Sequence, residues 1–105
     1  MQVAEAHRSR EVVQLLDIRD PYEWVAGHLE GAVHVPMGQL ATRQSELAAD
    51  RPIVVVCRSG NRAQEVTAAL RDAGYPAETL DGGMRAWMAA GLPAVSEDGQ
   101  PPRVA

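Results

Sequence analysis

Two runs of apolar residues, at positions 12–18 and 53–57, are the strongest feature of the hydrophobic pattern. Both are rich in branched side chains, and neither shows the regular alternation of polar and apolar residues that marks a half-buried strand. A strand that is apolar on both faces is typical of the interior of a parallel sheet. Weaker runs at residues 32–36 and 77–80 predict two further strands.

A helical pattern follows the second apolar run. Between residues 62 and 73, Ala63, Val66 and Leu70 fall on one face of a helix, while the other face is polar. Gly74 then supplies the residue type that most often ends a helix. This stretch is the clearest helix that the sequence predicts.

Other helices are expected at shorter patterns. Residues 20–23, with the sequence Asp-Pro-Tyr-Glu, place a capping acid, a proline and a glutamate where the first turn of a helix favours them, and predict a helix to about Ala26. Residues 40–49 and 84–90 are also predicted to be helical. Strands that alternate with helices indicate an α/β fold with a parallel sheet.

The length and composition suit one domain. The chain has 105 residues, of which 46% are hydrophobic and 23% charged, as in a folded globular protein. We expect this domain to cover residues 1–95. Residues 96–105 are polar and contain two prolines and a glycine, which predicts a loose C-terminal tail.

The charge and the apolar content exclude several classes of partner. Fourteen acidic residues against ten basic ones, all arginine, give a formal net charge of −4, so nucleic acid is not an expected partner. No stretch approaches the roughly 18 apolar residues of a membrane span, and the N-terminus lacks the pattern of a signal peptide. A cytoplasmic location without a membrane partner is therefore expected. The single cysteine, Cys57, excludes an internal disulfide.

The segment from Cys57 to Arg62 joins the purest predicted strand to the clearest helix. Ligands of open parallel sheets bind at the carboxyl ends of the strands, where this segment must lie. A short glycine-containing turn that enters a helix points backbone N–H groups inward and, with the helix dipole, forms an anion site that stabilises a thiolate. Arg58 and Arg62 add positive charge. A cation in the first turn of a helix destabilises the helix by about 0.3–1 kcal/mol. The presence of Arg62 there is therefore better explained by an anionic substrate than by folding.

Residues of this segment also have structural interpretations. A lone cysteine at the end of a buried strand is often core filler, but a buried structural cysteine has no need of flanking arginines. Asn61 is expected to cap the helix, with Gln64 completing a capping box, while Ser59 and Gly60 shape the turn and donate backbone N–H groups. No metal site is expected, because metal-ligand spacing is absent from the histidines, His7, His28 and His34.

Four segments together resemble one known family. Residues 57–62 closely resemble the active-site loop of rhodanese domains. Residues 16–24 are similar to the family's first motif, residues 27–36 to its second, and residues 80–87 to its closing motif. The matches follow in order over about residues 12–95. On these motifs the chain is identified as a member of the single-domain rhodanese (thiosulfate sulfurtransferase) family.

The resemblance implies a rhodanese-like α/β fold, with a five-stranded parallel sheet flanked by helices. The chain departs from the family at its start, where about eleven residues precede Val12 and the first strand and helix are expected to be abbreviated. It implies Cys57 as the catalytic nucleophile that accepts sulfur. Asp17 and Arg19 would be buried structural supports that tie the first motif to the active-site region, whereas the residues alone predict a turn acid and a surface arginine there. The substrate-binding positions, whose backbone amides would surround the outer sulfur, are Arg58, Ser59, Gly60, Asn61 and Arg62.

The implied activity is transfer of sulfane sulfur from thiosulfate, or a related small anionic donor, to cyanide or a thiol through a Cys57 persulfide. No cofactor is implied. Because the chain has one cysteine, the acceptor must be external: cyanide, a small thiol or a protein. One alternative is a cysteine phosphatase or arsenate reductase, but those enzymes place five residues between cysteine and arginine, whereas four separate Cys57 from Arg62. Another is a non-catalytic binding module, which usually lacks the cysteine.

Overall fold

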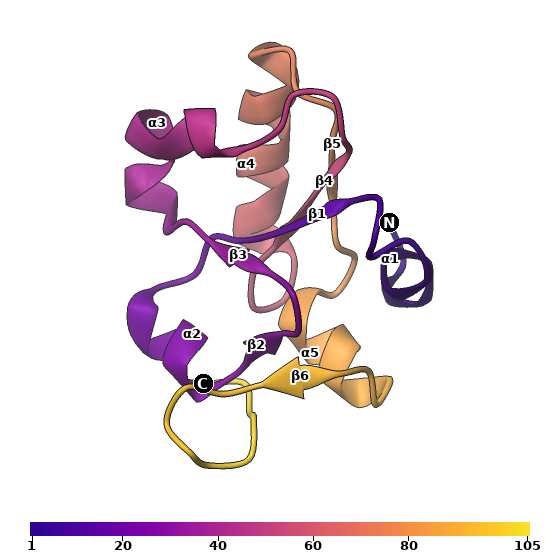
Figure 1. Ribbon diagram of the computed structural model, residues 1–105, viewed down its shortest axis with the longest axis vertical. Helices are drawn as coiled ribbons and strands as arrows, with labels where there is room; N and C mark the ends of the chain where they lie inside the picture. The colour runs from indigo at the N-terminus through magenta and orange to yellow at the C-terminus, as the bar shows by residue number, and fades with distance from the viewer.

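Four parallel strands form the central sheet of the computed structural model, which describes residues 1–105 (Figure 1). Their order across the sheet is β3-β1-β4-β5. A separate antiparallel pair joins β2 (His28–Leu29) to β6 (Ala94–Val95). The parallel sheet thus has four strands and not the five expected. Its strands are β1 (Gln14–Asp17), β3 (Val33–His34), β4 (Ile53–Val56) and β5 (Ala77–Thr79).

The helices follow most of the predicted patterns. Helix α2 has the predicted bounds, and both halves of its capping box are formed. The helix expected at residues 40–49 is instead a short α-helix between two single 3-10 turns, and a helix that the hydrophobic pattern did not indicate precedes β1. The elements are α1 (Val3–Arg8), α2 (Pro21–Ala26), η1 (Met37–Gln39), α3 (Leu40–Arg43), η2 (Gln44–Glu46), α4 (Asn61–Asp72) and α5 (Gly83–Ala89).

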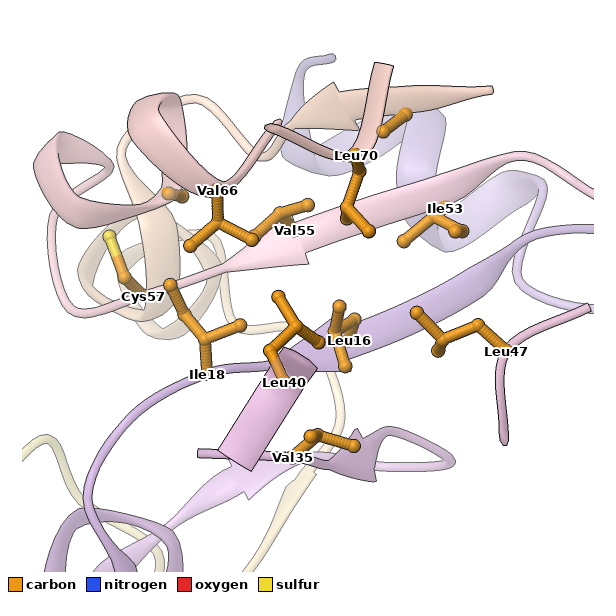
Figure 2. Packing of buried hydrophobic residues seen from close by; sticks show 12 residues of the cluster. Leu16, Ile18, Val35, Leu40, Leu47, Ile53, Val55, Cys57, Val66 and Leu70 are labelled. Carbon is orange, nitrogen blue, oxygen red and sulfur yellow. The ribbon is translucent and has the colours of Figure 1, made fainter. Parts of the chain in front are cut away.

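Each face of the sheet is covered by its own apolar core, because successive side chains of a strand point to opposite faces. Val55 belongs to the core beneath α3 and α4, which also holds Leu40 and Leu70 (Figure 2). Val54 belongs to the core on the other face, where α1 and α5 contribute side chains such as Trp87. Every residue of β1 and β4 is buried, as the apolar runs predicted.

The C-terminal segment differs from the expected loose tail. It runs beside α2 and β2 (Figure 1), where Glu97 N–H donates to Val25 O at 2.9 Å and Arg103 N–H donates to Ala26 O at 3.1 Å. Val104 packs against the core that contains Trp87. The expectation is therefore corrected: backbone hydrogen bonds, which no side-chain pattern signals, anchor this polar segment to the end of α2.

None of the helices is long and apolar enough to cross a membrane.

Candidate active site

Cys57 directly follows β4, at one end of the core beneath α4 (Figure 2). Its side chain is 1% exposed, and the backbone N–H of Gly60 donates to Sγ at 3.0 Å. Gly60 has φ +102°, a left-handed conformation that glycine adopts without strain. The turn that sends this N–H toward the sulfur therefore depends on a glycine at position 60.

The start of α4 differs in one detail from the sequence prediction. Gly60, and not Asn61, is the N-cap residue, and no side chain caps the helix. The predicted capping box between Asn61 and Gln64 is therefore wrong. Asn61 and Ser59 are exposed, so both side chains face solvent beside the buried sulfur.

Helix α5 holds the first two peptide groups of the loop. Met84 N–H donates to Cys57 O at 2.8 Å, and Arg85 N–H donates to Arg58 O at 3.0 Å. Gly83 has φ +58°, and a Cβ atom there would overlap with Cys57 O and lie 2.9 Å from the carbonyl carbon of Arg58. Gly83 of the closing motif thus allows α5 to approach the loop closely. The hydrophobic pattern did not indicate this role for Gly83.

The two arginines of the loop have different partners. Arg58 Nε donates to the backbone O of Ala105 at 3.1 Å. Arg62 Nη2 lies 3.3 Å from both carboxylate oxygens of Glu23 on α2, and the Glu23 side chain is 3% exposed. The sequence indicated Glu23 only as part of a helix cap. Its contact with Arg62, 39 residues away, has no local signal.

Asp17 and Arg19 are both fully buried, as the family resemblance implied and the residues alone did not. Arg19 donates to both carboxylate oxygens of Asp17, through Nε at 2.9 Å and Nη2 at 2.7 Å. Arg19 Nη2 also donates to Gly27 O at 2.7 Å. The pair therefore ties the end of β1 to the start of the second motif. It makes no hydrogen bond with the loop from Cys57 to Arg62, to which Glu23 of the first motif is joined instead.

Two of the histidines stack on one indole ring. The ring centroids of His28 and His34 lie 3.4 Å and 4.7 Å from that of Trp24. His34 Nε2 bonds to Arg19 O at 2.8 Å and His28 Nδ1 to Trp24 O at 2.9 Å. These contacts hold the connection between α2 and β3 in place.

Comparisons with known proteins agree with this geometry. A family model described as "Rhodanese-like domain" matches residues 1–90. A protein of Allochromatium vinosum named "Sulfurtransferase" is 41% identical over 90 residues, which cover 85% of this chain and 84% of that protein. The crystal structure of a rhodanese-related protein from Thermoplasma volcanium superposes with a TM-score of 0.86 at 25% identity. That match covers 90% of this chain and 95% of the other.

A second relative has a different name and a greater length. The "HTH-type transcriptional regulator Rv0324" of Mycobacterium tuberculosis is 42% identical over 102 residues, which cover 93% of this chain. The chain spans only 44% of the length of that protein. The same kind of domain therefore occurs both as most of a short protein and as part of a longer one.

Proposed function

The chain belongs to the rhodanese-like domain family, and from that premise we propose that it is a sulfurtransferase that carries sulfane sulfur as a persulfide on Cys57. The observation that carries the proposal is the hydrogen bond of 3.0 Å from the Gly60 N–H to the buried Sγ of Cys57. A backbone donor at the start of a helix stabilises an anionic sulfur. The name of the relative from Allochromatium vinosum supports the same class of reaction.

The first step loads the cysteine. The Cys57 thiolate attacks the outer sulfur of thiosulfate, the new bond forms between the two sulfur atoms, and the sulfur–sulfur bond of thiosulfate breaks. Sulfite leaves with the electron pair of that bond, so no oxidant or reductant is consumed. The negative charge ends on the outer sulfur of the persulfide. We expect the backbone N–H groups of residues 58–62 to stabilise that charge, as the Gly60 N–H, 3.0 Å from Sγ, supports.

The second step transfers the outer sulfur from Cys57 to an acceptor. Cyanide or a thiolate attacks the outer sulfur, and the Cys57 thiolate leaves, which restores the starting state. Because Cys57 is the only cysteine, the chain itself cannot discharge the persulfide by forming a disulfide. The acceptor is therefore an external molecule: cyanide, a small thiol or the thiol of a partner protein. This is covalent catalysis in two half-reactions, and ping-pong kinetics follow from it.

Loading by thiosulfate tests this proposal directly. We expect the folded protein to gain one sulfur atom when it is incubated with thiosulfate, and Cys57→Ser to gain none.

A second candidate function is favoured by the regulator from Mycobacterium tuberculosis. In this second function, the presence or absence of sulfur on Cys57 would act as a signal, without rapid turnover. The two functions share the loading step and differ in the unloading step, so the rate of transfer to a thiol acceptor separates them. Phosphatase chemistry is less well supported, because a loop with four residues between Cys57 and Arg62 is shorter than a phosphate cradle.

A further inference from the structure

Glu23 is a buried acid that stabilisation of its own helix does not explain. As the third residue of α2 it accepts the Asp20 N–H through Oε1 at 3.0 Å, which completes a capping box. That task can be performed on the surface of a protein. Instead the Glu23 side chain is 3% exposed, and burial of a carboxylate is costly without a charged partner.

The partner of Glu23 is Arg62, the second residue of α4 and the last of the loop that begins with Cys57. Arg62 Nη2 lies 3.3 Å from each carboxylate oxygen, although the Arg62 side chain is itself 37% exposed. The contact uses one nitrogen of the guanidinium group. Nε and Nη1 of Arg62 have no hydrogen-bond partner within the chain and remain available to an anion.

The helix dipole gives this pair a further consequence. Arg62 stands in the first turn of α4, where the dipole repels a cation. Without Glu23, we expect the guanidinium to turn away from the start of the helix into solvent. The carboxylate opposes that movement, because it attracts Arg62 from within the protein.

We propose that Glu23 is a positioning residue, whose buried carboxylate orients Arg62 so that its remaining N–H groups face the anionic sulfur donor at Cys57. The proposal rests on the sulfurtransferase function and assigns to it a residue outside the loop. Glu23 acts through Arg62 and does not touch the donor. It therefore affects the rate from the bound state, while the charge of Arg62 continues to attract the donor.

A double-mutant cycle measures this coupling. The variants are Glu23→Gln, Arg62→Gln and the two combined, and the readout is the rate of sulfur loading across a range of thiosulfate concentrations. Glu23→Gln keeps the size of the side chain and an oxygen for the Asp20 N–H. We expect it to lower the maximal loading rate about tenfold and to change the half-saturating thiosulfate concentration less than about twofold. The double variant loads at the rate of Arg62→Gln within about twofold.

Two controls accompany the cycle. Glu65→Gln, on the exposed face of α4, makes the same change of charge and loads at the wild-type rate. All rates are taken well below the melting temperature of each variant. If Glu23→Gln is too unstable to assay, the comparison of Arg62→Gln with the double variant suffices, since neither contains an intact pair.

The outcomes separate the two proposals. Two results overturn the positioning role. One is that Glu23→Gln loads sulfur at the wild-type rate. The other is that the double variant is slower than Arg62→Gln by the same factor by which Glu23→Gln is slower than the wild type, because the free-energy changes of independent substitutions add. Failure of the wild-type protein to load sulfur overturns the proposed function instead.

Discussion

At the scale of single residues, Cys57 combines two surroundings that act in opposite directions. Its side chain is 1% exposed and belongs to an aliphatic core, which disfavours a charged sulfur. The Gly60 N–H, 3.0 Å from Sγ, and the N-terminus of α4 favour a charged sulfur. A hydrogen bond to a charged group contributes about 1.5–3 kcal/mol. The result is a sulfur atom that is shielded from water yet supplied with a backbone donor.

Arg58 gives the first prediction at this scale. Unlike Arg62 it pairs with no Asp or Glu side chain, and the one hydrogen bond of its side chain is to the backbone O of Ala105. Its charge is therefore available to attract an anionic donor. Loss of a charge-assisted contact worth about 1.5–3 kcal/mol lowers kcat/KM for thiosulfate about ten- to hundredfold in Arg58→Ala. Steady-state kinetics at several salt concentrations measure the effect, which shrinks as salt screens the wild-type attraction.

Arg8→Ala is the matched control, because it removes the same charge from an exposed position on α1. It leaves kcat/KM near the wild-type value. An Arg58→Ala variant with normal kcat/KM at low salt would remove Arg58 from the account of donor binding.

At the scale of elements, the contact between α5 and the loop determines the geometry around the sulfur. Gly83→Ala introduces a Cβ that overlaps with Cys57 O, at a backbone conformation with φ +58° that alanine rarely adopts. We expect the loop to shift and the Gly60 N–H to move away from the sulfur. Loss of one such donor slows a reaction about 10²–10³-fold, so sulfur loading slows at least that far.

Gly91→Ala separates the effect of the steric overlap from the effect of backbone strain. Its φ of +71° is similar, but no atom lies within 4 Å of the added Cβ. Both variants lose stability through backbone strain of about 1–3 kcal/mol, and only Gly83→Ala loses loading activity. Equal loading by the two variants, measured with circular dichroism as a check of folding, would show that the approach of α5 is not needed.

The elements also show which features the sequence could predict. The bounds of α2 were predicted correctly because its signals, Asp20, Pro21 and Glu23, are local. Strands β1 and β4 were predicted because both of their faces are buried. The start of α4 was misplaced by one residue, since a glycine N-cap has no side-chain signature.

Within the candidate site, the loop itself was predictable and its supports were not. Cys57 and the residues up to Arg62 are adjacent in sequence, so their turn, helix start and charge could be recognised together. Glu23 reaches Arg62 across 39 residues, and α5 reaches the loop through backbone atoms. Contacts of these two kinds depend on how the elements pack, and residue types along the chain do not record them.

At the scale of the whole molecule, the C-terminal segment closes the structure beside α2. Deletion of residues 97–105 removes the two backbone hydrogen bonds to Val25 and Ala26 and the packing of Val104. We expect the free energy of unfolding to fall by about 1–3 kcal/mol and the melting temperature to fall by several degrees, as calorimetry would show. An unchanged melting temperature would mean that the segment is not anchored in solution.

The contribution of this segment depends on pH. A hydrogen bond from Arg103 lowers the pKa of the Asp98 carboxyl below its ordinary value. An acid whose pKa is lower in the folded state stabilises that state above its unfolded pKa, and the stabilisation is lost as the pH falls through the folded pKa. The part of the difference in melting temperature between the full chain and the deletion variant that Asp98 contributes is therefore lost as the pH falls through the pKa of Asp98.

The central claim, that Cys57 carries sulfur, is tested most directly by intact mass spectrometry of the protein after incubation with thiosulfate and then with cyanide. The account predicts a gain of the mass of one sulfur atom with thiosulfate and its loss with cyanide. It predicts neither change in a folded Cys57→Ser variant. Wild-type protein that stays unmodified with thiosulfate and with several other sulfane donors would contradict it.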